Sequence, residues 1–554
     1  MIEREVIMKK IIMLTALVCA LCGTGSVCRA ASGNHNICVV GSFYDLKSDT
    51  DYIDCYAIKN DGSLWLWRDT KQNEGIDKAV SAKIADNVKS IHQRYFITND
   101  NVLYELYKEH YSDLPTPRKV TEDVEGFNDC WWHECIIKTD GSLWVRGTNA
   151  SYGFMKEDMD FESDDFIKLM NNAESVSGGH YHTAVLKTDG TVWTYGFNQR
   201  GQIGDGTYNN SYRQKKIMSN ISSINTGVMA TYAITDDNIL WRWGNNCAEL
   251  TDPPDNDFLS PVKYLEDVKQ VCNKQAYNVV LKTNGDLWLY GENETDEYIQ
   301  ENSEVYNFSY PKKIMENITA ITDETTGGET CGYILALDND GNLYKVSEVF
   351  NGPNSKLVMG KVMDDVKLPE EKEPKEVKEF EDVKEGSKYY EAVTHLTRAG
   401  ITDGVTDTEF KPEKELSRAE TAAMLLRMTG KRDKKGDVNY IDVTADKWYY
   451  DIAGANARYG MMDGFEDNTF RGEDAVTDIQ LAALAGRSLR SEGTGGEGEE
   501  APAAPANIPD WAKADVEYAM KYGILTEEEL KAMSGKSMTR GEAGEILYRL
   551  YSVI

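Results

Sequence analysis

The sequence predicts two domains of different fold class: an all-β, seven-bladed propeller and, after it, a mainly α domain of three repeats. Three observations predict this division. A unit of two apolar runs around an Asp-Gly pair recurs through the first two-thirds of the chain, the composition changes after Val366, and three related segments follow that change. A unit of this kind with a period in the forties is typical of a propeller blade.

Each repeated unit consists of an apolar run, a turn and a second apolar run that closes on an aromatic residue. The closing aromatics, spaced 39, 40, 49, 48, 47 and 56 residues apart, are Trp65, Tyr104, Trp144, Trp193, Trp241, Trp288 and Tyr344. Asp-Gly supports the positive φ values of a tight hairpin turn because Gly has no Cβ. The two units without this Gly keep Asn99, Asn101 and Asn238, and Asn tolerates the left-handed region. We therefore expect a hairpin in every unit.

A second repeated element supports the same count. Residues 215–224 read Lys-Lys-Ile-Met-Ser-Asn-Ile-Ser-Ser-Ile, and residues 312–321 read Lys-Lys-Ile-Met-Glu-Asn-Ile-Thr-Ala-Ile. Further copies begin at Lys83, Lys119, Lys168, Lys263 and Lys361. No copy is evident before the first hairpin, so the two elements are offset by one unit. We predict that the stretch near Val362 pairs into the first blade and closes the ring.

The fourth unit, residues 178–207, is the fullest. It reads Gly-Gly-His-Tyr-His-Thr-Ala-Val-Leu-Lys-Thr-Asp-Gly-Thr-Val-Trp-Thr-Tyr-Gly and continues to Gly-Gln-Ile-Gly-Asp-Gly at 201–206. This unit resembles the repeat of the regulator of chromosome condensation (RCC1) family, whose members form seven-bladed propellers. The resemblance covers residues 37–368, although the other units lack the Gly-Gln-Ile-Gly-Asp-Gly tail. The family's roles in nucleotide exchange and chromatin binding do not carry over to an acidic chain that we expect to be exported.

The N-terminus predicts export. Lys9 and Lys10 precede an apolar run, and the small-x-small sequence before the expected cleavage site ends at Ala30, so we predict a signal peptide at 1–30. The run is too short to be a membrane anchor, and the true start is either Met1 or Met8. The net charge of −32 argues against nucleic-acid binding, which needs clustered Lys and Arg. We expect a secreted protein with no membrane contact after cleavage.

Seven cysteines remain in the expected mature chain: Cys38, Cys55, Cys130, Cys135, Cys247, Cys272 and Cys331. This odd, scattered set is not the pattern of a disulfide framework. At least one thiol stays unpaired within the chain, and the pairing of the others is left open.

The C-terminal third is divided by its composition. A charged, Pro-containing linker at 369–379 cannot bury a core, and a second linker rich in Gly, Pro and Glu occupies 491–507. Between and after them, the three related segments span 380–431, 439–490 and 508–554.

These segments resemble the S-layer homology (SLH) domain. The motifs that carry the resemblance are Phe-x-Asp-Val at 380–383, Gly-Ile-x-x-Gly at 400–404, Phe-x-Pro at 410–412, Ser-Arg-Ala-Glu at 417–420 and Thr-Arg-Gly-Glu at 539–542. The resemblance implies helical repeats around a pseudo-threefold axis that hold a protein non-covalently on a pyruvylated or otherwise anionic secondary cell-wall polymer. It therefore implies the surface of a Gram-positive-type bacterium.

The resemblance also implies a polymer-binding site centred on Arg418 and Arg540. A guanidinium can bond both oxygens of a carboxylate-bearing sugar ketal. The expected site residues are Gly404, Ser417, Arg418, Glu420, Trp448, Thr539, Arg540 and Glu542. Ser417 and Thr539 are also expected to cap helices, with Glu420 and Glu542 at the capping-box spacing. The alternative is that the two arginines only cap and solvate their helices.

The second and third repeats depart from the family pattern. Asp478 stands where Arg is expected, and an acid there would repel an anionic ligand. The third repeat lacks both the Gly-Ile-x-x-Gly and the Phe-x-Pro motifs. We therefore expect one or two functional grooves rather than three.

Metal-binding and catalytic signals are weak. His180 and His182, or the cluster Cys130, His133 and Cys135, could ligate a metal, but His133 is in register with His182 when the Asp-Gly turns are overlaid. That register favours a structural, buried and hydrogen-bonded role for both. We expect no metal, no cofactor and no catalytic residue.

The sequence favours a non-enzymatic surface protein whose propeller binds an unknown protein or glycan. Two alternatives stay open. The propeller face could cleave an extracellular polysaccharide or peptide, or the protein could be a structural component of a surface layer.

Overall fold

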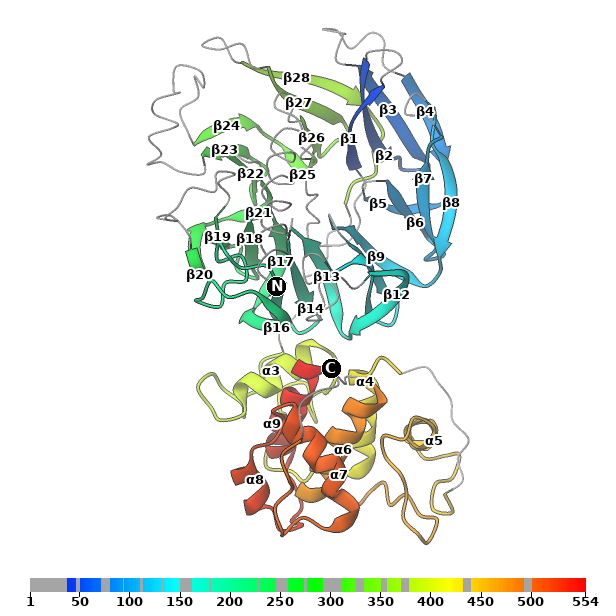
Figure 1. Ribbon diagram of the computed structural model, residues 1–554, viewed down its shortest axis with the longest axis vertical. Coiled ribbons are helices and arrows are strands. Elements are labelled where there is room, and N and C mark those ends of the chain that lie inside the picture. The colour runs from blue at the N-terminus through cyan, green and yellow to red at the C-terminus, as the bar shows by residue number, and fades with distance from the viewer. Residues whose placement is uncertain are drawn as a thin grey trace, which may run out of the picture.

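The computed structural model describes residues 37–45, 50–70, 80–92, 94–109, 113–130, 133–149, 162–179, 181–227, 229–245, 258–273, 277–291, 311–324, 333–349, 356–369, 378–431, 440–492 and 501–554. The expected signal peptide, His180, Cys247 and Cys331 lie outside these residues, as do the central parts of both linkers. The described chain forms a ring of sheets and a helical domain packed against one side of it (Figure 1).

The described strands form seven antiparallel four-stranded sheets, which confirms the propeller prediction. The first four blades are β1 (Ile37–Asp45), β2 (Thr50–Ile58), β3 (Leu64–Thr70) and β4 (Val80–Ala85); β5 (Val88–His92), β6 (Tyr95–Thr98), β7 (Leu103–Tyr107) and β8 (Thr116–Thr121); β9 (Val124–Asp129), β10 (His133–Lys138), β11 (Leu143–Thr148) and β12 (Glu162–Met170); β13 (Ala173–Gly178), β14 (His182–Lys187), β15 (Val192–Gly196) and β16 (Ser211–Met218). The last three are β17 (Ile221–Thr226), β18 (Ala230–Thr235), β19 (Leu240–Gly244) and β20 (Phe258–Leu265); β21 (Val268–Asn273), β22 (Tyr277–Lys282), β23 (Leu287–Gly291) and β24 (Lys312–Met315); β25 (Ile318–Glu324), β26 (Tyr333–Asp338), β27 (Leu343–Val349) and β28 (Lys356–Met363).

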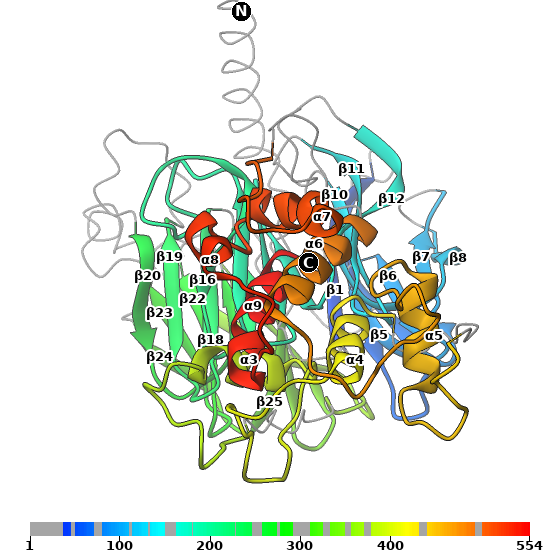
Figure 2. The same cartoon turned by 90° about the horizontal axis from the view of Figure 1, so that it is seen from below.

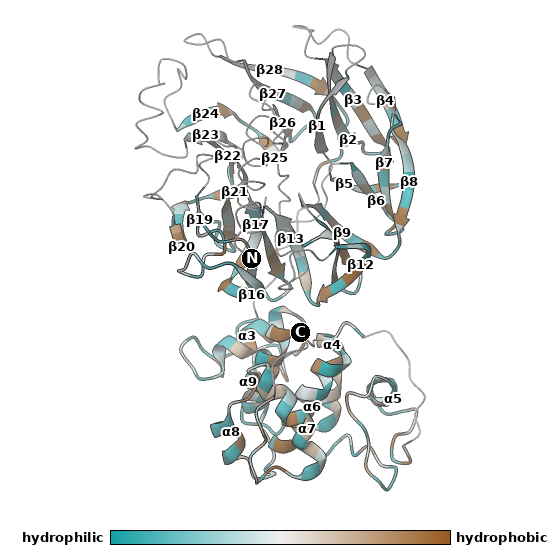
Figure 3. Cartoon of the chain, in the orientation of Figure 1, coloured by the Kyte–Doolittle hydropathy of each residue, from teal (hydrophilic) through white to brown (hydrophobic). Residues whose placement is uncertain are grey.

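Burial changes from the inside of a blade to its edge. Every residue of β6 and of β14 is buried, whereas β8 is mostly exposed. In Figure 3 the outer strands β8, β12 and β20 carry both hydrophilic and hydrophobic residues, as expected for strands with one solvated face. The buried apolar side chains join neighbouring blades, because Leu186 of the fourth blade packs in one cluster with Ile224 and Trp243 of the fifth.

The recurring hairpin is held by a local network that explains its sequence. In the first blade, the Asp61 carboxylate accepts from the backbone N–H of Ser63 at 2.9 Å, and the Trp65 indole donates to Ser63 Oγ at 2.8 Å. The Lys59 ammonium lies 4.8 Å from the centre of the Trp65 ring, a cation–π geometry. In the two units without the turn Gly, Asn101 and Asn238 adopt φ values of 58° and 63°, as predicted.

The ring closes between its two ends. Val366 forms a bridge with Lys59 of the first blade, and the Lys367 N–H donates to Ile58 O at 2.8 Å. The prediction that the stretch near Val362 pairs into the first blade is therefore correct for Val366. It is wrong for Lys361–Met363, which belongs to β28 at the edge of the seventh blade. The repeated Lys-Lys-Ile-Met element is thus the outer strand of one blade, and the apolar residues after it begin the next.

The turn between blades carries an Asn or Asp in the left-handed conformation. These residues, with φ between 58° and 62°, are Asn87, Asp123, Asn172, Asn220, Asp267, Asn317 and Asp365. Asn and Asp are the non-Gly residues that adopt this conformation most readily. The turn residue is therefore part of the repeat, although its strand neighbours vary.

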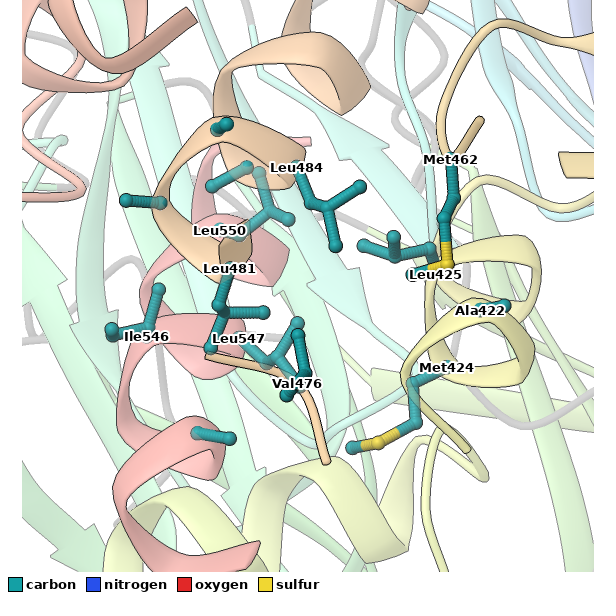
Figure 4. Close-up of a cluster of buried hydrophobic side chains, with 14 of the residues drawn as sticks. Ala422, Met424, Leu425, Met462, Val476, Leu481, Leu484, Ile546, Leu547 and Leu550 are labelled. Atoms are coloured by element: carbon teal, nitrogen blue, oxygen red, sulfur yellow. The ribbon is translucent and has the colours of Figure 1, made fainter. Parts of the chain in front are cut away.

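The C-terminal domain is helical, with α3 (Tyr390–Arg398), α4 (Arg418–Met428), α5 (Tyr450–Arg458), α6 (Asp478–Ser491), α7 (Asp510–Lys521), α8 (Glu527–Ala532) and α9 (Arg540–Val553). Three backbone hydrogen bonds connect the repeats in a cycle: Leu416 N–H to Met538 O at 3.0 Å, Met538 N–H to Val476 O at 2.9 Å, and Val476 N–H to Leu416 O at 2.9 Å. One residue from each repeat thus meets at a pseudo-threefold axis. Val476 contributes to the shared apolar core, in which Leu425, Leu481 and Leu547 are fully buried (Figure 4).

The predicted caps of the helical domain are confirmed. Ser417 opens α4 and Thr539 opens α9, each with a complete capping box closed by Glu420 or Glu542. Thr477 opens α6 in the same way, with Gln480 as its partner. Among the described residues, each helix is too short or too polar to cross a membrane.

The helical domain contacts the propeller at the end that carries the Asp-Gly turns (Figures 1 and 2). The Arg398 side chain, 5% exposed, donates to Asp236 at 3.0 Å and to Ile221 O at 3.1 Å. It covers Gly190, where a Cβ would come within 2.3 Å of its guanidinium carbon. The ring of His395 lies 3.2 Å from Asp189 O. The fullest repeat of the propeller is therefore part of the contact with the helices.

A second contact is centred on Glu492, whose side chain is 2% exposed. Its carboxylate pairs with Lys168 of the propeller at 2.7 Å and with Lys431 of the helical domain, and accepts from Asn171 Nδ2 at 2.9 Å. The C-terminal Ile554 O accepts from the Asn171 N–H at 2.9 Å. These bonds connect the two domains through buried polar groups.

Candidate functional site

Arg418 and Arg540 each hold a loop of the neighbouring repeat. Arg418 donates to Phe470 O at 3.0 Å and to Asp463 O at 3.1 Å. Arg540 donates to the corresponding carbonyls of the first repeat, Phe410 O at 3.1 Å and Asp403 O at 2.7 Å. Both side chains are nearly buried. These arginines therefore connect repeats, a role that neither helix capping nor solvation describes.

In the second repeat, Asp478 occupies the position of these arginines, but it accepts hydrogen bonds instead of donating them. Its carboxylate accepts from the N–H groups of Ser534 and Gly535, at 3.0 and 2.8 Å, in the third repeat. The third repeat lacks the Phe-x-Pro loop whose carbonyls accept from an arginine elsewhere. The two departures from the family pattern thus belong to one contact: where the loop offers donors instead of acceptors, an acid replaces the arginine.

A first groove, here called the Trp448 groove, lies between the first and second repeats. Its volume is about 520 Å³, and Lys414, Ser417, Glu420, Trp448 and Glu473 are among its lining residues. Trp448 is 62% exposed. Of its acids, Glu473 pairs with Lys447 at 2.5 Å.

Glu420 is the most buried acid of that groove. Burial opposes its ionisation, but the backbone hydrogen bond from Ser417, together with the charges of Lys414 and Arg540, holds the pKa of Glu420 below its usual value. These three groups compensate the negative charge of Glu420. An anionic ligand in the groove would therefore be repelled less than the formal charge of Glu420 suggests.

A second groove, the Trp511 groove, has a volume of about 800 Å³ and is formed by the second repeat together with Arg418 of the first and α7 of the third. Its lining includes Arg418, Arg471, Arg487 and Trp511. Arg471 pairs with Asp467 at 2.7 Å, and both side chains are about half exposed. Trp511 is 54% exposed. This groove brings three guanidinium groups and one indole together with the carboxylates of Asp463, Glu466 and Asp467.

The predicted site residues do not form a single site. Ser417, Glu420 and Trp448 line the Trp448 groove, whereas Arg418 lines the Trp511 groove. Neither groove is lined by the other predicted residues, which are Gly404, Thr539, Arg540 and Glu542.

Sequence reasoning missed Trp511, Arg471 and Arg487 as groove residues. A signal for Trp511 was present: it stands twelve residues before Gly523, just as Trp448 stands twelve before Gly460. Both glycines follow the first helix of their repeat.

The predicted register of the two histidines is confirmed. His133 Nε2 lies 3.3 Å from Thr183 Oγ1 of the fourth blade, and His182 Nε2 lies 2.9 Å from Thr231 Oγ1 of the fifth. Both imidazoles are buried and hydrogen-bonded to the next blade. The structural role expected of this position is therefore present in both blades.

In the third blade, two thiols lie beside this histidine. Donor atoms of Cys130, His133 and Cys135 all lie within 4.8 Å of one another, and the three residues are buried. Hydrogen bonding with Cys130 lowers the pKa of Cys135 to about 6, although burial opposes the shift.

Family comparisons find both domain types. The S-layer homology domain family matches residues 379–422, and the repeat family of the regulator of chromosome condensation matches residues 173–202, in the fourth blade. The chain thus combines an RCC1-like seven-bladed propeller with a helical region that contains an SLH domain.

Curated relatives match short parts of the chain. The surface-layer 125 kDa protein of Lysinibacillus sphaericus is 33% identical over 139 residues, which is 25% of this chain and 12% of that protein. The amylopullulanase of Thermoanaerobacterium thermosulfurigenes is 30% identical over 31% of this chain and 9% of that enzyme. The cellulosome-anchoring protein of Acetivibrio thermocellus is 26% identical over 26% of this chain and 32% of that protein. The chain thus spans less than a third of the length of each. The SLH domain and the surface-layer and anchoring relatives indicate a protein of the cell surface.

Among solved structures, human WBSCR16 aligns with a TM-score of 0.35 and 15% identity, covering 60% of this chain and 82% of that chain. Prp20p of Saccharomyces cerevisiae aligns with a TM-score of 0.35 and 13% identity, covering 62% and 86%.

Proposed function

We propose that this protein is secreted and held non-covalently on a pyruvylated or otherwise anionic secondary cell-wall polymer by its SLH repeats. The observation that carries the proposal is the Trp511 groove, in which Arg418, Arg471 and Arg487 accompany an exposed indole. The domain division given by the sequence, with a propeller at 37–368 and repeats at 380–431, 439–490 and 508–554, is part of the same proposal.

The groove suits a sugar that carries a carboxylate. Guanidinium groups bind carboxylates with two parallel hydrogen bonds, and an exposed indole offers a flat apolar surface for a sugar ring. Arg418 already donates to two carbonyls, so we assign it the role of positioning the loop of the second repeat. Arg471 is the better ligand for the polymer. Its half-exposed ion pair with Asp467 contributes little stability and exchanges readily for another carboxylate.

We further propose that the propeller is displayed as a binding module for a protein or a glycan, without catalytic activity of its own. The contact with the helices uses Asp189, Ile221 and Asp236 at the turn end of the fourth and fifth blades. A partner would therefore bind elsewhere on the ring. Turnover of a wall polysaccharide or peptide by the purified full chain would contradict this part and favour the enzymatic alternative.

The anchoring proposal is tested by co-sedimentation of the full chain with purified wall sacculi. Trp511→Ala and Arg471→Ala should each weaken binding at least tenfold, a loss equivalent to about 1.4 kcal/mol. Ile441→Ala is the matched control, because Ile441 is 73% exposed on the same domain and lines neither groove.

Trp448→Ala is measured beside these variants. A loss confined to Trp448→Ala would move the polymer site to the Trp448 groove. Unchanged binding of all the tryptophan and arginine variants would contradict a groove-based anchor.

A further inference from the structure

The third blade carries a cluster of three residues of metal-ligating type: Cys130, His133 and Cys135. The structural role of this position in the repeat needs only the histidine. The antiparallel ladder pairs Glu134 with Asp129 and Cys135 with Asn128, and Cys130 N–H donates to His133 O at 2.9 Å. His133 and Cys135 are two residues apart on one strand, and side chains two apart point to the same face. Cys130 is opposite His133, so the hairpin brings all three side chains to one face.

The fourth blade shows what this position looks like without thiols. Gly179 N–H donates to His182 O at 2.8 Å, so Gly179 corresponds to Cys130, and Ala184 corresponds to Cys135. A Cβ on Gly179 would come within 2.5 Å of His182 Nδ1. The residue at this position therefore faces the Nδ1 edge of the imidazole, and in the third blade that residue is a cysteine.

The imidazole of His133 is held in a suitable orientation. Its Nε2 lies 3.3 Å from Thr183 Oγ1, so, as in the fourth blade, its Nδ1 edge is turned towards the position that Cys130 occupies. A hydrogen bond on the second ring nitrogen is the usual way in which proteins orient a metal-ligating histidine. The same bond exists in the fourth blade, so the repeat supplies the orientation and the third blade adds the sulfur atoms.

Tyr195 supplies a further polar atom beside the cluster. Its ring packs in the same buried cluster as Cys130 and Cys135. Its hydroxyl is fully buried and has no hydrogen-bond partner among the described residues. A buried hydroxyl without a partner costs stability. A metal-bound water, or the metal itself, would satisfy this oxygen.

We propose that Cys130, His133 and Cys135 bind one zinc ion. Two thiolates and one imidazole are preferred ligands of Zn²⁺, and in a tetrahedral site such atoms lie roughly 3.5–3.8 Å apart. In the observed cluster all three donor atoms lie within 4.8 Å of one another, at most about 1 Å beyond that spacing. Binding would release the thiol protons, including the one that Cys130 donates to Asn128 Oδ1 at 3.1 Å. With three protein ligands, a bound water would complete a tetrahedral site.

The test uses the full chain, reduced, exposed to zinc and then desalted, with bound metal measured by mass spectrometry. Two variants, Cys130→Gly and Cys135→Ala, restore the residues of the fourth blade, which adopts the same hairpin. They are therefore expected to fold. Cys272→Ala is the matched control, because Cys272 is a buried cysteine of the sixth blade outside the cluster.

We expect one zinc per chain in the wild type and in Cys272→Ala, and a loss of that equivalent in both cluster variants. Cobalt in place of zinc should give a thiolate-to-cobalt absorption band that both cluster variants lose. A thermal shift on adding zinc should likewise be present in the wild type and absent in Cys135→Ala.

Two results would overturn the proposal. One is a wild type that retains no more zinc than Cys135→Ala. Peptide mapping under non-reducing conditions would then show whether Cys130 and Cys135 have formed a disulfide instead. The other is retention of the full equivalent by both cluster variants, which would place the metal elsewhere.

Discussion

Glu492 is the residue through which the contact between the domains can be tested most sharply. Glu492→Gln keeps the size and shape of the side chain but removes its charge. In the wild type the carboxylate pairs with Lys168 at 2.7 Å and with Lys431, and accepts from Asn171 at 2.9 Å. A neutral amide can accept from one of these donors, while its own N–H groups face the other ammonium.

The expected loss follows from burial. Removing one partner of a buried ion pair costs about 3–5 kcal/mol because a charge is left uncompensated. The Lys168 and Lys431 side chains are 30% and 17% exposed, so water partly solvates the two ammonium groups after the change. We therefore expect Glu492→Gln to lower the free energy of unfolding by about 2–3 kcal/mol.

The pH dependence has a defined sign. Burial alone would raise the pKa of Glu492, but Lys168, Lys431 and Asn171 hold it below its usual value. A carboxyl whose pKa is lowered by folding stabilises the protein above the pKa it has when unfolded, and this contribution is lost as the pH falls through the folded value. The difference between wild type and variant should be full at pH 7 and vanish in acid.

The assay is urea unfolding of the full chain at pH 7, followed by tryptophan fluorescence. Glu527→Gln is the control, because Glu527 and Lys531 form an ion pair in which both side chains are 62% exposed, and such pairs contribute less than about 1 kcal/mol. If the Glu492→Gln variant is as stable as this control, the buried contact contributes nothing to stability.

Three further predictions concern other buried groups. Val366→Asp should destabilise the ring by about 3 kcal/mol in thermal unfolding, because it places an unpaired charge in the fully buried closing contact. The control Asp364→Asn, at a side chain that is 72% exposed, should change thermal unfolding little. Asp478→Ala should cost about 3 kcal/mol in urea unfolding, because two backbone N–H groups lose a charged acceptor. Burial lowers the pKa of Lys187 to about 8, so Lys187→Met should stabilise the protein by about 1–2 kcal/mol at pH 7, with a gain that disappears between pH 8 and 10.5, where the ammonium of the unfolded wild type still binds its proton.

The propeller could be predicted from sequence because each blade is specified locally. Asp61, Ser63 and Trp65 are bonded to one another within five residues, so the network is visible as a motif. The closing contact was visible as well, because the outer-strand element and the hairpin are offset by one unit. The error of a few residues arose because the Lys-Lys-Ile-Met element is an outer strand, whereas the closing residue is the first apolar residue after the turn.

The contact between the domains could not be predicted from sequence. His395 and Asp189 are 206 residues apart, and neither stands in a motif that suggests the other. The relation between Asp478 and Gly535 was partly visible, as two separate departures from the family pattern. Only the fold shows that the two departures form one contact, because the Asp478 carboxylate accepts from the Gly535 N–H.

The groove residues were predicted incompletely for a similar reason. The family resemblance suggested one shared site for Arg418 and Trp448. In the fold, Arg418 donates to Phe470 O in the loop of the second repeat and lines the Trp511 groove, whereas Trp448 lines the Trp448 groove. The order of motifs along the chain does not show which residues share a groove, because each arginine contacts a loop of a neighbouring repeat.

Anchoring to a wall polymer is tested by removing that polymer from the wall. The full chain is sedimented with purified wall sacculi before and after acid extraction removes the secondary polymer. We expect strong binding to intact sacculi and loss of binding after extraction. Binding that survives extraction, or no binding to intact sacculi, would contradict it.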